Sequence, residues 1–207
     1  MKSDSKPLSE MSLEELWQLF PIILKKHNPL YSEWYAQEKS ELVGIIGTHN
    51  IKRINHIGST AVKGLMAKPT IDILLEIDKS CDIENLKADL FQANWLLMSE
   101  ETKPDLKLSF NKGYTPTGFA EKIFHLHVRY FNDWDELYFR DYLIEHKDIM
   151  TEYEKLKLEL QKQYEHNRDE YTSAKSDFII KYSKIAKEKY KNRYLEKLCK
   201  TSGLTTN

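Results

Sequence analysis

Cysteine, glycine and proline are scarce in this 207-residue chain, and long hydrophobic runs are lacking. The two cysteines, Cys81 and Cys199, lie far apart and form no CxxC pair, which argues against a disulfide framework and a thiolate zinc site. No stretch approaches the ~20 consecutive apolar residues of a membrane helix, and the polar N-terminus has no signal-peptide core. We therefore expect a protein of the reducing cytoplasm that has no membrane partner.

An excess of either charge is also lacking, because 31 Lys and Arg stand against 32 Asp and Glu and give a formal net charge of −1. A general nucleic-acid binder needs a basic excess to displace counterions, so nucleic acid is not expected as a partner. Residues 181–200 are locally basic, a pattern that favours a solvated helix face over a surface for an acidic partner. The 41% of hydrophobic residues is enough for a core and excludes wholesale disorder.

Helical signals occupy both ends of the chain. Ser12 and Glu15 have the spacing of a capping box, and apolar residues follow them at helical spacing. Asn28 as a cap, Pro29 in the first turn and a terminal glycine predict a second helix over residues 28–47. Residues 133–200 carry apolar side chains at a spacing of about 3.6 residues, which predicts helices throughout.

The middle of the chain has the patterns of strands. Alternation of apolar and polar residues, or short β-branched runs, predicts strands over residues 51–57, 70–77, 106–110 and 124–131, with a further candidate at 95–98. Two Gly, a Pro and two Thr predict a loop over residues 112–118.

The order of these elements predicts an α+β protein with a mixed sheet. We divide it into a helical lead-in (1–47), an α/β core (48–132), C-terminal helices (133–200) and a flexible tail (201–207), which together form one compact unit.

The densest chemical information lies in the segment that begins at His56. Gly58, Ser59 and Thr60 follow a predicted strand and open a short helix, where backbone N–H groups and two hydroxyls can cradle an anion. The simpler interpretation is that Gly58 permits a turn and Ser59 caps the helix. His56 is interpreted as a structural residue.

Asp72 lies on the following predicted strand. Ile71 and Ile73 belong to one face of that strand, so Asp72 shares the other with Thr70 and Leu74. A carboxylate in a sheet must face water, a metal or a partner. A salt bridge with Lys68 is the simpler alternative.

The predicted strand at 124–131 presents His125, His127 and Arg129 together on its polar face. Imidazoles favour Zn²⁺, Mn²⁺, Fe or Ni over Mg²⁺, so these histidines with Asp72 are candidate ligands of one divalent metal. The alternative is a polar strand face that is hydrogen-bonded to the C-terminal helices.

Four further polar residues lie in the helical part. Arg168, Tyr171 and Lys175 share one helix face, and Arg140 lies near the start of another helix. Together they could hold phosphate or carboxylate groups. Salt bridges within the helices, such as Arg140 with Asp141, are the alternative.

The string HIGSTAVKGLMAKPTIDILLEI at 56–77, with HLHV at 125–128 and FRDYL at 139–143, resembles the GrpB family of the nucleotidyltransferase (polymerase-beta-like) superfamily. The resemblance implies a nucleotidyltransferase-like mixed sheet followed by a helical part. It also implies a phosphate-bearing ligand or nucleotide near the turn. The expected ligand-binding residues are Gly58, Ser59, Thr60, Lys68, Arg129 and Arg140.

The chain departs from the superfamily pattern at Leu74. Active nucleotidyltransferases resemble one another in having two carboxylates at positions i and i+2, which help to hold two Mg²⁺ ions. Here position i+2 is Leu74, and Glu76 lies about 13 Å along the strand from Asp72, whereas two catalytic metals are about 3.5–4 Å apart. One metal held by Asp72 with His125 or His127, or none, is expected.

Two functions therefore remain open. The first is an enzyme in which Asp72 and His127 are catalytic. The second is a non-catalytic protein that binds an anionic small molecule, a nucleotide or a partner protein. The missing carboxylate favours the second function, and a fold alone does not decide between them.

Overall fold

The computed structural model describes residues 6–195, and a mixed five-stranded sheet lies at its centre. The strands are β1 (Ile51–Ile57), β2 (Thr70–Ile77), β3 (Leu96–Glu101), β4 (Lys107–Thr115) and β5 (Gly118–Tyr130), in the spatial order β1-β2-β5-β4-β3. Strands β2 and β5 are parallel and the other neighbours are antiparallel. The expected α+β class and mixed sheet are confirmed, and β1 and β2 have the predicted bounds.

The loop predicted over residues 112–118 is wrong, because β4 and β5 continue through most of it as a hairpin. Tyr114 pairs with Phe119, and the register shifts between Lys112 and Tyr114. Gly113 lies at this irregularity with a φ of +93°, and a Cβ there would lie 2.3 Å from the Lys122 carbonyl oxygen. The glycine therefore marks a bulge inside a strand and not the end of the strand.

Helices precede and follow the sheet, as expected. They are α1 (Leu13–Leu19), α2 (Tyr31–Ile46), α3 (Ile83–Gln92), α4 (Asp135–Glu145), α5 (Lys147–Tyr164), α6 (Arg168–Ser173) and α7 (Ser176–Lys189). The capping box of Ser12 and Glu15 is present at α1. Helix α2 starts at Tyr31, later than predicted, because the Asn28 side chain accepts a hydrogen bond from Leu30 N at 3.0 Å and holds a turn before the helix. The predicted tail at 201–207, Cys199 and the end of the basic segment lie outside the described residues.

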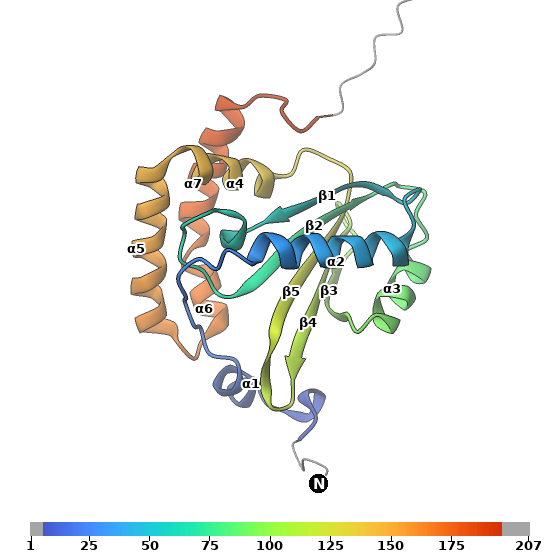
Figure 1. Ribbon diagram of the computed structural model, residues 1–207, viewed down its shortest axis with the longest axis horizontal. Helices are drawn as coiled ribbons and strands as arrows, with labels where there is room; N and C mark the ends of the chain where they lie inside the picture. The colour runs from blue at the N-terminus through green and yellow to red at the C-terminus, as the bar shows by residue number, and fades with distance from the viewer. Residues whose placement is uncertain (1–5, 196–207) are drawn as a thin grey trace, which may run out of the picture.

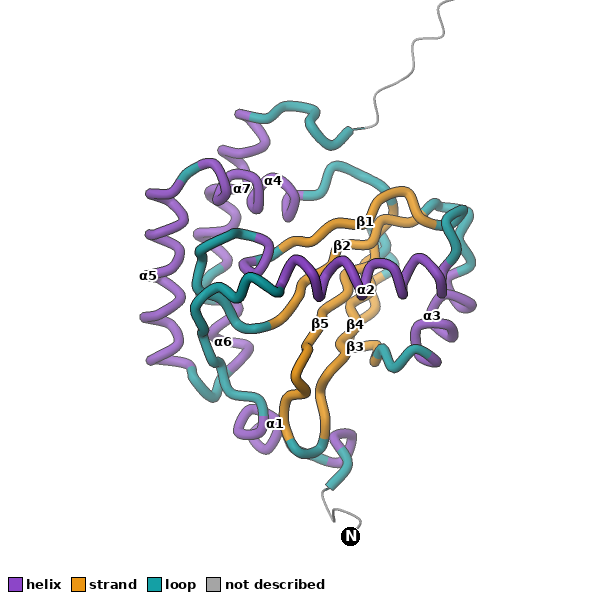
Figure 2. The backbone as a smooth tube through the Cα atoms, in the orientation of Figure 1, coloured by secondary structure: helices purple, strands orange, loops and turns teal. Residues whose placement is uncertain are grey.

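The two faces of the sheet are covered by different helices. Figure 1 shows α2 across one face, and α4 to α7 gathered at one side of the sheet. The apolar face of β2 packs with Leu42 of α2 and Leu90 of α3 in the main core. The strand path and the helices are followed most easily in the tube of Figure 2. None of the helices in the described range is both long and apolar enough to cross a membrane.

The second face of β2 is less open than its alternation suggests. Leu74 is fully buried in a cluster with Ile57 and with Leu137 of α4. Glu76 is also fully buried, and its carboxylate accepts hydrogen bonds from the Arg53 guanidinium at 2.5 and 2.7 Å. The C-terminal helices therefore cover this face and leave Asp72 at the margin of a cavity.

Candidate anion-binding site

A cavity of about 860 Å³ lies between the sheet and the C-terminal helices. Its volume is typical of small-molecule sites. Most of the residues singled out in the sequence line it, and they come from the turn after β1, the approach to β2, the strands β2 and β5, and the C-terminal helical part. They are Gly58, Ser59, Thr60, Lys68, Asp72, His125, His127, Arg129, Arg168, Tyr171 and Lys175.

Gly58 is required by the fold itself. Its φ is +69°, and a Cβ at this position would lie 2.3 Å from Asp72 Oδ2. A side chain at Gly58 would therefore displace the Asp72 carboxylate, whether or not a ligand is bound. The turn interpretation is enough to explain this glycine, and the turn brings Ser59 to the wall of the cavity.

Asp72 and His125 lie on adjacent parallel strands in register and form a hydrogen bond of 3.0 Å between Oδ1 and Nδ1. The other ring nitrogen, Nε2, lies 3.1 Å from Arg168 Nη2 and 2.8 Å from the Tyr114 hydroxyl. A guanidinium can only donate, so Nε2 is the acceptor and Nδ1 carries the proton. A neutral His125 thus connects the carboxylate to the arginine.

Burial alone would raise the pKa of Asp72, but the hydrogen bond from His125 and the nearby histidine and Lys68 charges lower it to about 2. Burial lowers the pKa of His125, against the opposing effect of Asp72. Burial also lowers the pKa of His127 to about 4. At neutral pH the pair is therefore a carboxylate and a neutral imidazole.

This arrangement does not fit the expected metal site of Asp72, His125 and His127. One nitrogen of His125 carries a proton and the other accepts from Arg168, so neither has a lone pair left for a metal. Within residues 6–195, no group of three or more His, Cys, Asp or Glu side chains is placed to hold a metal ion. Several cations that line the same cavity also disfavour another cation there.

Five lysines line the cavity. Lys107 and Lys187 form salt bridges with carboxylates, and among the described residues the other three form none. They are Lys68 on the approach to β2, Lys157 of α5 and Lys175 at the start of α7. Burial, aided by neighbouring cations, lowers the pKa to about 7 for Lys68 and Lys157 and to about 8 for Lys175. Their charged forms are thus destabilised in the absence of an anion.

Lys157 was missed in the sequence, yet it is the most deeply buried of these lysines, with 2% of its surface exposed. Its Nζ donates to Ser59 Oγ at 3.1 Å and also to the carbonyl oxygen of Met66. The available signal was its position four residues after Tyr153 and three before Leu160, on the buried stripe of α5. Tyr114, which accepts a hydrogen bond of 2.7 Å from Arg168, was also missed, because its strand was interpreted as a loop.

Two of the expected ligand-binding residues, Thr60 and Arg129, form hydrogen bonds within the protein. The Thr60 hydroxyl donates to the Thr70 carbonyl oxygen at 2.9 Å and lies 3.0 Å from His56 Nε2. Arg129 lines the cavity, but its Nη1 donates to the Leu108 and Val128 carbonyl oxygens.

Arg140 is not among the residues that line the cavity. Its guanidinium donates to Asp141 at 2.7 and 2.9 Å, to the His56 carbonyl oxygen and to the Tyr194 hydroxyl. The simpler alternative for Arg140, a salt bridge with Asp141, is what the structure contains. A ligand in the cavity would therefore meet Lys68, Lys157, Lys175 and Arg168 in place of Arg140.

Comparison with known proteins decides the family. The sequence model of one family, described as GrpB protein, matches residues 21–184. The chain belongs to the GrpB family. A glutamate-rich protein GrpB of Alkalihalophilus pseudofirmus is 34% identical over 161 residues, which are 76% of this chain and 91% of that protein. A UPF0157 protein of Pseudomonas aeruginosa is 36% identical over 74% of this chain and 63% of its own length.

A solved GrpB-family structure has the same architecture. The crystal structure of the conserved protein GrpB from Enterococcus faecalis superposes with a TM-score of 0.69 and is 29% identical, covering 81% of this chain and 99% of that one. The family resemblance and the mixed sheet with helices are therefore confirmed. Neither the names of these relatives nor their fold assigns a ligand to them.

Proposed function

We propose that this GrpB-family protein binds a phosphate-bearing small molecule in the cavity between the sheet and the C-terminal helices, without a two-metal centre. The observation that carries the proposal is the convergence of Lys68, Lys157 and Lys175 on one cavity. Lys157 is buried and the other two are partly buried, and among the described residues none of the three forms a salt bridge with a carboxylate. Buried charges are costly unless they are paired. A bound anion would provide the missing partner.

The donors suit phosphate better than a single carboxylate. Lysine ammonium groups present three hydrogen-bond donors each, and Arg168 adds a guanidinium at the same wall. The Ser59 hydroxyl already accepts from Lys157 Nζ, so its own proton is available to a phosphate oxygen. More than one doubly charged phosphate group is needed to balance three lysines and an arginine.

Asp72 and His125 have a positioning role in this proposal. The carboxylate fixes the ring of His125, and the ring in turn accepts from Arg168, whose guanidinium also lies 5.3 Å from the centre of the Tyr114 ring. This chain of contacts joins β2, β5, β4 and α6. Arg168 is thereby held at the cavity wall before a ligand arrives, which lowers the entropic cost of binding.

The environment of Leu74 argues against nucleotidyl transfer by the usual two-metal route. Leu74 occupies the position of the second carboxylate and is fully buried beside Leu137. Glu76 is engaged with Arg53 and does not line the cavity. Asp72 alone lacks the charge and geometry to clamp two divalent cations.

The test is the binding of inorganic pyrophosphate in the presence of EDTA, measured by titration calorimetry and, separately, by the shift in thermal unfolding. We expect one saturable site, and a stabilisation of about 2.7 kcal/mol at a concentration 100 times the dissociation constant. Lys157→Met and Lys175→Met should weaken binding tenfold or more. Lys155→Met, at an exposed position of the same helix α5, is the matched control and should bind as the wild type does. Absence of saturable binding to the folded wild type would contradict the proposal.

A further inference from the structure

Two lysines of the cationic cavity, Lys68 and Lys175, have amino groups with no hydrogen bond and no salt bridge to another residue within the described range 6–195. Both lie over the ring of the buried Tyr171, with Nζ 5.7 Å from the ring centre for Lys68 and 4.4 Å for Lys175. A ring face stabilises an ammonium group, so the closer contact favours the charged form of Lys175. Lys157 differs from both, because its Nζ donates to Ser59 Oγ at 3.1 Å.

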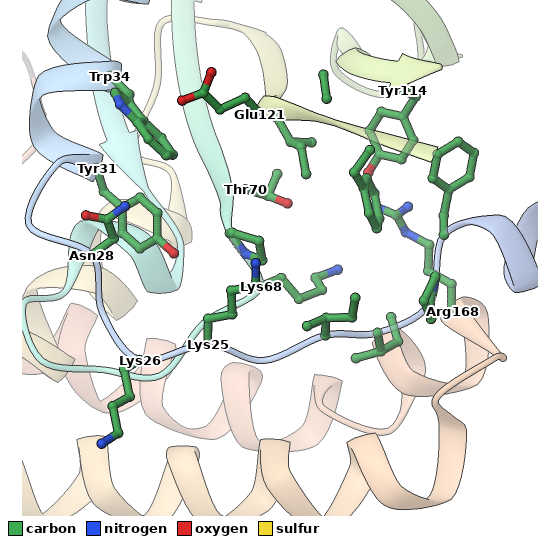
Figure 3. A pocket seen from close by; sticks show the side chains of 18 residues that line it. Lys25, Lys26, Asn28, Tyr31, Trp34, Lys68, Thr70, Tyr114, Glu121 and Arg168 are labelled. Carbon is green, nitrogen blue, oxygen red and sulfur yellow. The ribbon is translucent and has the colours of Figure 1, made fainter. Parts of the chain in front are cut away.

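The position of Lys68 makes its amino group accessible to a small molecule. Lys68 lines the cationic cavity and also a second cavity of about 470 Å³. Figure 3 shows Lys68 in the middle of this second cavity, with Tyr31 on one side and Arg168 on the other. A compound bound in the cationic cavity can therefore meet the Lys68 amine at the boundary between the two spaces.

The surroundings of Lys68 favour its neutral form. Burial, aided by the charges of Arg168, Lys175 and Lys157, lowers the pKa of Lys68 to about 7, and Asp72 opposes the change. Half of the molecules then carry a neutral amine at pH 7, whereas an ordinary lysine is neutral in roughly one molecule in 3,000. Because this amine has no polar partner in the described range, its lone pair is available for reaction.

A desolvated lysine beside other cations is the arrangement that activates an amine as a nucleophile toward carbonyl groups. We infer that Lys68 forms an imine with a phosphorylated aldehyde or ketone, whose phosphate group is held by the other cations of the cavity. This inference rests on the proposed function and names the class of ligand.

The reaction is balanced without a further reagent. The lone pair of Lys68 Nζ adds to the carbonyl carbon, and a proton passes from nitrogen to oxygen to give a carbinolamine. The C–O bond then breaks, the nitrogen loses its remaining proton, and water leaves as the C=N bond forms. One amine and one carbonyl compound give one imine and one water molecule, with no oxidation or reduction.

The charge of the ligand decides whether Lys68 stays neutral. One phosphate dianion balances two of the four cations formed by Lys68, Lys157, Lys175 and Arg168, and leaves Lys68 beside uncompensated positive charge. Pyrophosphate carries more negative charge and favours the ammonium form of Lys68. A monophosphate of a carbonyl compound is therefore compatible with imine formation, and pyrophosphate should suppress it.

The inference is tested by incubating the protein at pH 7 with glyceraldehyde 3-phosphate and cyanoborohydride, which reduces an imine to a stable secondary amine. Peptide mass spectrometry then gives the rate of labelling at each lysine. We expect Lys68 to be labelled at least tenfold faster than Lys155, which is exposed on α5. Excess pyrophosphate should remove this advantage.

Two variants and a second probe serve as controls. Lys68→Met should lose the fast adduct, and Lys155→Met should keep it. Glyceraldehyde, which has no phosphate group, should label Lys68 at least tenfold more slowly than its phosphate ester does, and should label exposed lysines as readily. Equal labelling of Lys68 by the two probes would contradict a phosphorylated ligand.

Failure of this inference is distinguishable from failure of the proposed function. If Lys68 is labelled no faster than Lys155, or if the fast adduct forms on another lysine, the imine inference is wrong. Calorimetric binding of pyrophosphate does not require an imine, so the proposed function then stands as long as pyrophosphate binds. If pyrophosphate does not bind the folded wild type, the proposed function is wrong and the inference falls with it.

Discussion

The buried ammonium group of Lys157 makes stability depend on pH in an unusual direction. Burial lowers the pKa of Lys157 from its ordinary value of 10.5 to about 7. Between these two pH values the unfolded chain binds a proton that the folded chain has lost. Stability rises with pH wherever the unfolded state binds more protons, so raising the pH from 7 to 9 should stabilise the fold.

The size of the effect follows from the same pKa values. One full proton of difference changes the free energy of unfolding by about 1.4 kcal/mol per pH unit. The folded chain is half titrated at pH 7 and fully deprotonated at Lys157 by pH 9. The gain from Lys157 alone over this interval is therefore about 2 kcal/mol. Lys68, with a pKa of about 7, should add to the gain of the wild type.

The assay is urea unfolding at pH 7, 8 and 9 for the wild type, Lys157→Met and the exposed control Lys155→Met. We expect the gain between pH 7 and pH 9 to be smaller by about 2 kcal/mol in Lys157→Met than in the other two chains. Equal pH dependence in all three would refute the reasoning, because it would mean that Lys157 keeps its ordinary affinity for protons in the folded state.

Three further predictions concern the site. Binding of pyrophosphate at pH 8 should take up protons, because the anion raises the lowered pKa values of Lys68, Lys157 and Lys175. The binding enthalpy should therefore differ between buffers of different ionisation enthalpy. Identical enthalpies in those buffers would count against this proton uptake. The substitution Asp72→Asn should keep the hydrogen-bond acceptor for His125 Nδ1 but remove a negative charge from the cavity. Pyrophosphate should therefore bind severalfold more tightly to this variant when EDTA is present. Weaker binding would contradict this prediction. The substitution Leu74→Asp should lower the free energy of unfolding, measured in urea, by more than the ~2–5 kcal/mol that a buried Leu→Ala change costs, because Leu74 is fully buried. A stable variant with a new Mg²⁺ site would contradict this prediction.

The sequence was most informative where the pattern is local. A short β-branched run predicted the bounds of β1, and alternation predicted those of β2. Face analysis placed Asp72 on the same side of the sheet as His125 and His127, and Asp72 and His125 pair in register. The capping box of Ser12 and Glu15 was likewise confirmed, because both partners lie within one turn.

Failures arose where distant segments meet. Lys157 is 98 residues from the Ser59 hydroxyl that it contacts, so no local pattern links the two. The burial of Leu74 depends on α4, which the alternation of β2 cannot reveal. The histidines suggested a metal by residue type, whereas the protons and partners of His125 depend on Arg168 and Asp72 in three dimensions.

A crystal structure of the protein with ATP and Mg²⁺ tests the central claim most directly. We expect phosphate density within hydrogen-bonding distance of Lys157 and Lys175, beside Ser59, with no pair of Mg²⁺ ions at Asp72. Phosphates bound elsewhere, or two Mg²⁺ ions coordinated by the Asp72 carboxylate, would contradict the account.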